Sequence, residues 1–177
     1  MRFLSVDEAR NLAKRFAANG QAELGPYAYV SGYPSLQVAF EGEKPGRFFW
    51  LAERVVESLE YFDWCMLWVT QTGVWGSAEN VHLFQALRRS YGSHHDIDES
   101  PALRCLRHEK VDLVSFLHVG MLNGWDMLLL TSHDYGRAFV SHDGWVELVQ
   151  PSGQSLEPIG TLFSEAKLKC RTLRPAS

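Results

Sequence analysis

Two Ser-His-Asp tripeptides, Ser132–Asp134 and Ser141–Asp143, contain the residue types of a hydrolytic catalytic triad. A triad needs its three side chains to converge, whereas adjacent residues of a strand point to opposite faces. Both tripeptides end predicted strands, where serine, histidine and aspartate are common turn and cap residues. The G-x-S-x-G sequence, which presents the nucleophile of α/β-hydrolases, is absent from the chain. We therefore expect local turn hydrogen bonds at both tripeptides.

The segment His94–Glu99 concentrates residues that bind metals. Its His94, His95, Asp96 and Asp98 could recruit a divalent ion through imidazole and carboxylate ligands. Contiguous ligands on a loop rarely close a coordination shell, and the chain has no H-E-x-x-H or H-x-x-x-H pair. We therefore expect a solvated polar loop, with no structural metal and no other cofactor in the protein.

Cysteine chemistry is not indicated either. Cys65, Cys105 and Cys170 are an odd number, widely spaced and without a C-x-x-C, which argues against a disulfide framework or a zinc knuckle. Cys65 lies in an apolar run and is expected to be a buried, inert thiol. Arg104 and Arg107 could lower the pKa of the Cys105 thiol, but no paired base is evident, so we expect a resting thiol there too.

Aromatic residues point to binding more than to catalysis. Strand alternation places Trp64 and Trp68 on one face of a predicted strand, where most of the aromatic side chains should belong to the core. Trp75 lies instead in a glycine-rich loop, with Asp63 and Glu79 nearby in the sequence. Aromatic residues flanked by carboxylates are typical of a protein-binding hot spot, so we expect Trp75, Glu79 and Asp63 to bind a partner.

The charge of the chain is unevenly distributed. Seventeen basic and twenty-one acidic residues give a net charge of −4. Four of the basic residues lie in the last eleven positions, which hold no acid, so the preceding body carries −8. An acidic body disfavours nucleic acid and favours a basic protein partner, although a merely solubilising surface has the same composition.

The sequence predicts one α+β domain over residues 1–177, a mixed, mostly antiparallel sheet with helices packed on it, and a loose basic tail at residues 166–177. The helix starting after Ser5 is the best marked, because Ser5 and Glu8 match a capping box. Further helices are expected from Pro45 to Leu59, from Ser77 to Tyr91, from Glu109 to Asn123, and over Leu162–Cys170. Strands are expected at Leu36–Phe40, Trp64–Thr70, Trp125–Leu130, Arg137–Val140 and Trp145–Val149, the last two joined by a hairpin at Asp143-Gly144.

No apolar run approaches the roughly 18 residues that span a bilayer. The first residues, Met1–Ser5, lead directly into polar sequence without the apolar region of a signal peptide. Together with the cysteine pattern, this predicts a cytoplasmic protein without a membrane partner.

Several motifs resemble those of a small, uncharacterised bacterial family. They are Cys65–Thr70, Gly73–Trp75, Glu79-Asn80, Leu83, Leu87-Arg88, Ser90–Gly92, Leu113–Phe116, Leu122–Asp126, Arg137 and Ser141–Asp143. The resemblance covers roughly Phe49 to Val149 and implies no catalytic residues. Small acidic α+β proteins with tryptophan-rich strands are also similar in character to immunity proteins of bacterial toxin systems.

Two classes of function remain open from the sequence. The first is a non-enzymatic bacterial protein-binding module, most concretely an immunity-type protein that neutralises a cognate toxin, for example a basic toxin domain. The alternative is a small hydrolase or metal-dependent enzyme that uses the histidine-containing loops. The absence of a convergent nucleophile and base in the motifs favours binding without catalysis.

Overall fold

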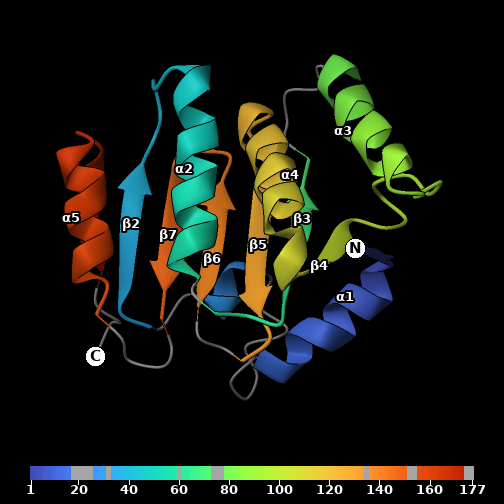
Figure 1. Cartoon of the computed structure of the whole chain (residues 1–177), viewed down its shortest axis with the longest axis horizontal. Helices are drawn as coiled ribbons and strands as arrows, with labels where there is room; N and C mark the ends of the chain where they lie inside the picture. Colours follow the sequence, from blue (N-terminus) through green and yellow to red (C-terminus); the bar gives the residue numbers. More distant parts are fainter. Residues whose placement is uncertain are drawn as a thin grey trace.

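A single antiparallel sheet organises the chain in the computed structural model, which describes residues 1–16, 26–30, 33–59, 61–72, 78–133, 136–150 and 155–173. The strands are β1 (Arg2–Leu4), β2 (Ser35–Ala39), β3 (Trp64–Gln71), β4 (Ala102–Leu106), β5 (Asp126–Thr131), β6 (Arg137–Ser141), β7 (Trp145–Val149) and β8 (Lys169–Leu173). Their order is β1-β4-β3-β5-β6-β7-β2-β8, with every neighbouring pair antiparallel (Figure 1). The fold is therefore α+β as expected, but the described sheet is wholly antiparallel and not mixed.

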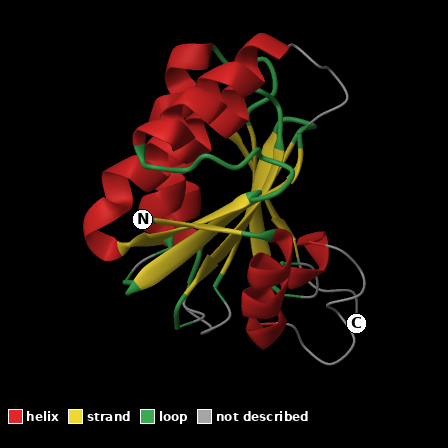
Figure 2. Cartoon of the chain, turned by 90° about the vertical axis from the view of Figure 1, so that its right-hand side faces the viewer, coloured by secondary structure: helices red, strands yellow, loops and turns green. Residues whose placement is uncertain are grey.

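Helices cover both faces of this sheet. They are α1 (Val6–Ala13), α2 (Pro45–Ser58), α3 (Ala78–Ser90), α4 (Lys110–Leu122) and α5 (Glu157–Glu165), with 3-10 turns η1 (Lys14–Phe16), η3 (Pro26–Tyr29) and η4 (Arg107–Glu109). Helices α2 to α5 lie on the face turned toward the viewer in Figure 1, which we call the front face. Helix α1 and η3 pack on the opposite, back face, so the sheet lies between two helical layers (Figure 2). Among the described residues no helix is long and apolar enough to cross a bilayer.

Strand alternation divides the core into two clusters. Leu67 and Leu129 point to the front face and pack with Val55 of α2 and Phe116 of α4. Residues one position away along the same strands belong to the back cluster, which Ala9 of α1 helps to close. Sheets that are buried on both sides need apolar residues on both sides, which explains the continuous apolar sequence of β3 and β5.

The capping box of α1 is confirmed. The Glu8 N–H donates to Ser5 Oγ at 3.3 Å, and the Ser5 N–H donates to a Glu8 carboxylate oxygen at 3.0 Å. These bonds satisfy amides that a helix start leaves without intrahelical partners.

The hairpin at Asp143-Gly144 is also confirmed, and it connects β6 to β7. Gly144 has φ of 79°, a left-handed conformation that side chains disfavour. Its carbonyl accepts hydrogen bonds from the N–H groups of Phe40 (2.7 Å) and Glu41 (2.9 Å), which fixes the hairpin against the end of β2.

Strand β3 is an inner strand of the sheet, between β4 and β5, but it is not fully enclosed. Trp64 and Trp68 share the back face, as alternation requires, yet both are only half-buried. In the described part of the chain, the helices on the back face, α1 with η1 and η3, are shorter and fewer than those on the front face.

Other differences concern short or late elements. Strands β1 and β4 were not predicted, because three to five residues of mixed polarity carry no clear period. Helix α5 spans Glu157–Glu165 and not Leu162–Cys170. Part of the segment expected to be a loose basic tail is ordered: Lys169–Leu173 forms β8, which pairs with β2.

Candidate functional site

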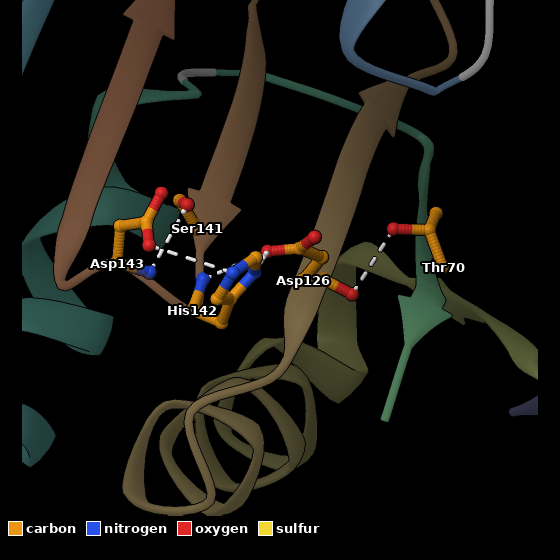
Figure 3. A network of polar contacts seen from close by, with 5 residues as sticks. All are labelled: Thr70, Asp126, Ser141, His142 and Asp143. Atoms are coloured by element: carbon orange, nitrogen blue, oxygen red, sulfur yellow. Dashed lines mark hydrogen bonds and ion pairs between the residues drawn. The ribbon is translucent and has the colours of Figure 1, made fainter. Parts of the chain in front are cut away.

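The second Ser-His-Asp tripeptide lies where β5 begins and the β6–β7 hairpin turns (Figure 3). One carboxylate oxygen of Asp126 accepts hydrogen bonds from the backbone N–H of His142 at 2.7 Å and from its ring Nδ1 at 2.8 Å. Thr70 Oγ1 of β3 donates to the backbone carbonyl of Asp126 at 3.2 Å. We call the Asp126–His142 pair the hairpin clasp, because it fastens the turn to the neighbouring strand.

The charge of Asp126 acts on the His142 ring. The hydrogen bond from Asp126 raises the pKa of His142 above its ordinary value, and the negative charges of Asp126 and Asp143 add to this effect against a smaller opposing effect of burial. The Asp143 carboxylate lies 3.4 Å from the ring Nε2. Both ring nitrogens therefore face carboxylates, which favours the protonated ring.

Ser141 does not complete a triad. It is buried, and its Oγ accepts a hydrogen bond from the Asp143 N–H at 3.2 Å. The cavity beside His142 has a volume of about 190 Å³ and is lined mainly by apolar side chains and turn backbone. Small-molecule sites usually have volumes of about 300–1,000 Å³. The geometry is that of a turn held by side-chain hydrogen bonds.

The first Ser-His-Asp tripeptide lies at the other ends of β3 and β5, where β3 begins and β5 ends. Ser132 Oγ accepts a hydrogen bond from the Asp63 N–H at 3.0 Å, and the Ser132 N–H donates to the Trp64 carbonyl at 2.9 Å. His133 Nε2 lies 2.7 Å from the Asp63 carboxylate. Asp134 lies outside the described residues, so its contribution to the expected turn is not described.

The candidate metal ligands are exposed and do not converge. His94, Asp96 and Asp98 are solvent-exposed, and His95 Nδ1 lies 3.2 Å from the carboxylate of Glu99. Within the described parts of the chain, no three histidine, cysteine, aspartate or glutamate side chains are grouped to hold an ion. The loop is positioned instead by backbone turns from Asp96 and by the buried side chain of Ile97.

The cysteines are free, and two of them are deeply buried. Cys65 and Cys105 face each other across β3 and β4. Burial raises the pKa of Cys105 to about 12 and that of Cys65 well above its usual range. The neighbouring arginines do not offset this desolvation, so both thiols stay protonated and unreactive, as expected for core residues.

The three residues expected to bind a partner do not form one described cluster. Trp75 lies outside the described residues, and Glu79 lies in the first turn of α3, with its side chain likewise outside the description. Asp63 is exposed, but it precedes the lower end of β3 and contacts His133, whereas α3 lies beside the upper part of the sheet (Figure 1). Proximity in the sequence therefore overstates how close Asp63 is to the start of α3.

A different surface gathers exposed apolar side chains. Val111, Ser115, His118 and Leu122 recur at spacings of four, three and four residues along α4, which places them on one side of the helix. Val111 is 74% exposed and Leu122 39%, and Phe49 of α2, 45% exposed, packs edge-to-face on His118 with ring centroids 5.4 Å apart. We call these five residues the outer stripe of α4.

The polar members of the outer stripe do not offset its apolar character. Ser115 Oγ donates to the Val111 carbonyl at 3.1 Å, so its hydrogen is used within the helix. Burial lowers the pKa of His118, which leaves the ring neutral near pH 7.

Carboxylates flank the stripe. On α2, Arg54 pairs with Glu53 at 2.9 Å and with Glu57 at 2.7 Å, so one cation faces two anions and an excess negative charge remains. On α4, Asp112 accepts a hydrogen bond from the Tyr91 hydroxyl at 2.6 Å, which raises the pKa of Tyr91 to about 12. The stripe therefore combines an apolar centre with a polar, partly acidic border, as protein interfaces do.

Sequence reasoning did not identify this surface, although a signal was present. The predicted helix Glu109–Asn123 is apolar on most sides, and no formally charged residue occurs between Asp112 and Asp126. A helix that is apolar all round is normally enclosed. Because α4 forms the outer layer on the front face, one of its apolar sides is exposed (Figure 1).

The resemblance to a small bacterial family rests on the residues quoted above, and the likeness to immunity proteins rests on the general type of the chain, small, acidic and rich in tryptophan. Comparison with known proteins neither supports nor contradicts them. A scan against protein-family models, a search of curated proteins and a search of solved structures found no match to this chain.

Proposed function

We propose that this protein is a non-enzymatic, protein-binding module of the bacterial immunity type, which neutralises a cognate toxin by covering a basic surface of that toxin. The observation that carries the proposal is the outer stripe of α4, where Val111, Leu122 and Phe49 are exposed together on adjacent helices. Apolar side chains that are exposed along one side of a helix and on its neighbour are typical of protein interaction sites. The proposal includes a cytoplasmic location, in keeping with three cysteines that are free in the structure.

The charge of the chain supports a basic partner. The body carries −8, and carboxylates of α2 and α4 border the stripe. Complementary charge speeds association and rejects wrong partners, while desolvated apolar side chains supply most of the affinity. In the proposed complex, Leu122 and Phe49 are the desolvated anchors and Glu53 and Glu57 belong to the solvated rim.

The serines and histidines of the two Ser-His-Asp tripeptides give a second reason to favour binding over hydrolysis. Ser141 and Ser132 accept hydrogen bonds from backbone amides, and the two neighbouring histidines contact Asp126 and Asp63. A catalytic serine needs a base within hydrogen-bond reach. These side chains instead connect strands and turns.

The test is rescue from toxicity. A toxin candidate encoded next to this chain is co-expressed with the wild type and with Leu122→Asp. We expect Leu122→Asp to lose protection, because a buried interfacial anchor contributes about 2 kcal/mol or more, a thirtyfold change in affinity. Leu162→Asp is the matched control, since Leu162 is also 39% exposed but belongs to α5, and α5 lies on the far side of α2 from α4 (Figure 1).

Two further variants distinguish the alternatives. Trp75→Ala tests the anchor predicted from the sequence. If Trp75→Ala loses protection while Leu122→Asp still protects, the binding site is not the outer stripe. A His133→Ala/His142→Ala variant tests catalysis after its fold has been verified by circular dichroism. Loss of protection in the histidine variant alone would contradict binding without catalysis.

A further inference from the structure

We propose that the open edge of β8, together with the groove between β8 and α5, binds an extended acidic segment of another protein as an additional strand. Strand β8 is the last strand of the described sheet and pairs only with β2 within it. No described strand pairs with its other edge, and the backbone amide and carbonyl groups of that edge can therefore pair with a further strand. This surface is distinct from the outer stripe of α4, and its test does not depend on the toxin.

The groove beside this edge is large enough to take side chains. Its volume is about 840 Å³. The strand side includes Leu36 of β2 and Cys170 and Thr172 of β8. The helix side includes Thr161 and Ser164 of α5 together with the carboxylates of Glu157 and Glu165, so the groove itself favours uncharged side chains. Alternate side chains of an added strand would point into this groove, while the others would point to the back face.

Helix α5 is held firmly enough to form one wall. Phe163 is fully buried and packs edge-to-face on Trp50 of α2, with ring centroids 5.9 Å apart. At Gly160, a Cβ would lie 3.6 Å from a Leu36 methyl group, so the helix approaches the sheet closely there. The Arg47 guanidinium donates to the Ala166 carbonyl at 2.5 Å and ties the end of α5 to α2.

The charges of β8 indicate which segment fits. Lys169 and Arg171 are exposed, lie two residues apart and therefore share the back face. Their partners in β2, Ala39 and Gln37, are neutral, and neither cation forms an ion pair with a described residue. Opposite charges directly across two strands are favourable, so glutamate or aspartate at alternate positions of the added strand complements this edge.

A second copy of the chain fits this edge poorly. Pairing β8 with its own copy about a two-fold axis would bring Lys169 and Arg171 of one copy close to the same cations of the other. Like charges across strands are destabilising, and lysine on an edge strand is a common defence against such pairing. The favoured occupant is therefore an acidic segment of a different protein.

The probe is an N-acetylated heptapeptide with glutamate at alternate positions and threonine or valine between them. Binding is measured by fluorescence anisotropy, and the site is located by amide chemical shifts of β8 and α5. We expect saturable binding with shifts centred on β8. A Lys169→Glu/Arg171→Glu variant should weaken binding by about tenfold or more, since two favourable pairs become repulsive.

The matched control is Lys14→Glu/Arg15→Glu, which makes the same charge change at two exposed residues on the back side of the fold. It should change binding less than twofold. A peptide with proline at its centre has the same charge but cannot complete the strand pairing, so it should not bind. Ser164→Trp, which fills the groove at an exposed position, should also prevent binding while leaving the fold intact.

Three results would overturn the proposal. Absence of binding by the acidic peptide would mean that the basic residues only protect the edge. Equal binding of the proline peptide would show attraction by charge without strand addition. Equal binding of a peptide with lysine in place of glutamate would remove the charge complementarity.

Discussion

Replacing Asp126 with alanine should destabilise the protein through the hairpin clasp and not through loss of a reaction. Asp126 accepts two hydrogen bonds from His142, one from its backbone N–H and one from its ring. The carboxylate is largely buried, with its side chain 12% exposed, whereas the ring is 36% exposed. The two bonds therefore differ in how strongly solvent weakens them.

The magnitude follows from these environments. A backbone N–H left without a partner costs about 1–3 kcal/mol. The ring interaction is partly screened by water, and we assign it about 1 kcal/mol. Asp126→Ala should thus reduce the free energy of unfolding by about 3 kcal/mol. His142→Ala, which keeps the backbone bond, should cost about 1 kcal/mol, and Asp126→Asn, which keeps an acceptor oxygen, should lie between the two.

The pH dependence gives a sharper signature. Because the folded-state pKa of His142 is raised, its stabilising contribution is fully present below the unfolded value and is lost as pH rises through the folded value. The difference in the free energy of unfolding between wild type and His142→Ala should therefore become smaller from pH 5.5 toward pH 9. Equilibrium urea unfolding at several pH values measures this difference.

Two outcomes would refute this reasoning. If Asp126→Ala and His142→Ala reduce the free energy of unfolding by the same small amount, the hydrogen bond from the His142 backbone N–H to Asp126 contributes nothing to stability. A difference that grows with rising pH would show that Asp126 does not favour the protonated ring.

Two further predictions concern the core and the hairpin. Phe116→Ala should cost about 3–5 kcal/mol in urea unfolding, because Phe116 is fully buried and packs edge-to-face on Phe84 at 5.4 Å; a loss under 1 kcal/mol would contradict its central position. Gly144→Ala should cost about 2 kcal/mol or more, since an L-residue is strained at φ of 79° and its Cβ would lie 2.8 Å from the Glu41 Cβ; an unchanged thermal midpoint would contradict this account of the hairpin.

Local signals in the sequence were sufficient where a single segment determines its own structure. Three features depend only on residues that are close together in the sequence: the helix cap at Ser5, the hairpin at Gly144 and the apolar run of β3. Strands β1 and β8 could not be found in this way, because short polar strands are defined by their partners β4 and β2. Pairing of that kind depends on distant residues and has no local period.

In the candidate sites too, local features could be predicted from the sequence, whereas contacts between distant residues could not. The turn function of the Ser-His-Asp tripeptides could be argued from strand geometry, but Asp126 and Asp63 could not be identified as the partners of the two histidines. Those contacts depend on which strands are neighbours in the sheet. Asp63 and Glu79 are close in the sequence, but a strand of eight residues separates them, so the sequence alone does not determine how far apart they lie in the fold.

The two ends of the sheet and its helical front side have different roles in this molecule. Polar side chains at the strand ends, such as Asp126 and Asp63, are held by hydrogen bonds that position turns, so a substitution there alters stability before it alters recognition. The exposed side of α4 makes few such bonds. A purely solvated helix face tolerates charged residues at almost no cost in stability, yet this helix has none from Leu113 to Leu122. The apolar side of α4 therefore supports the proposed binding of a partner at the outer stripe, where a protein surface would exclude water from these side chains.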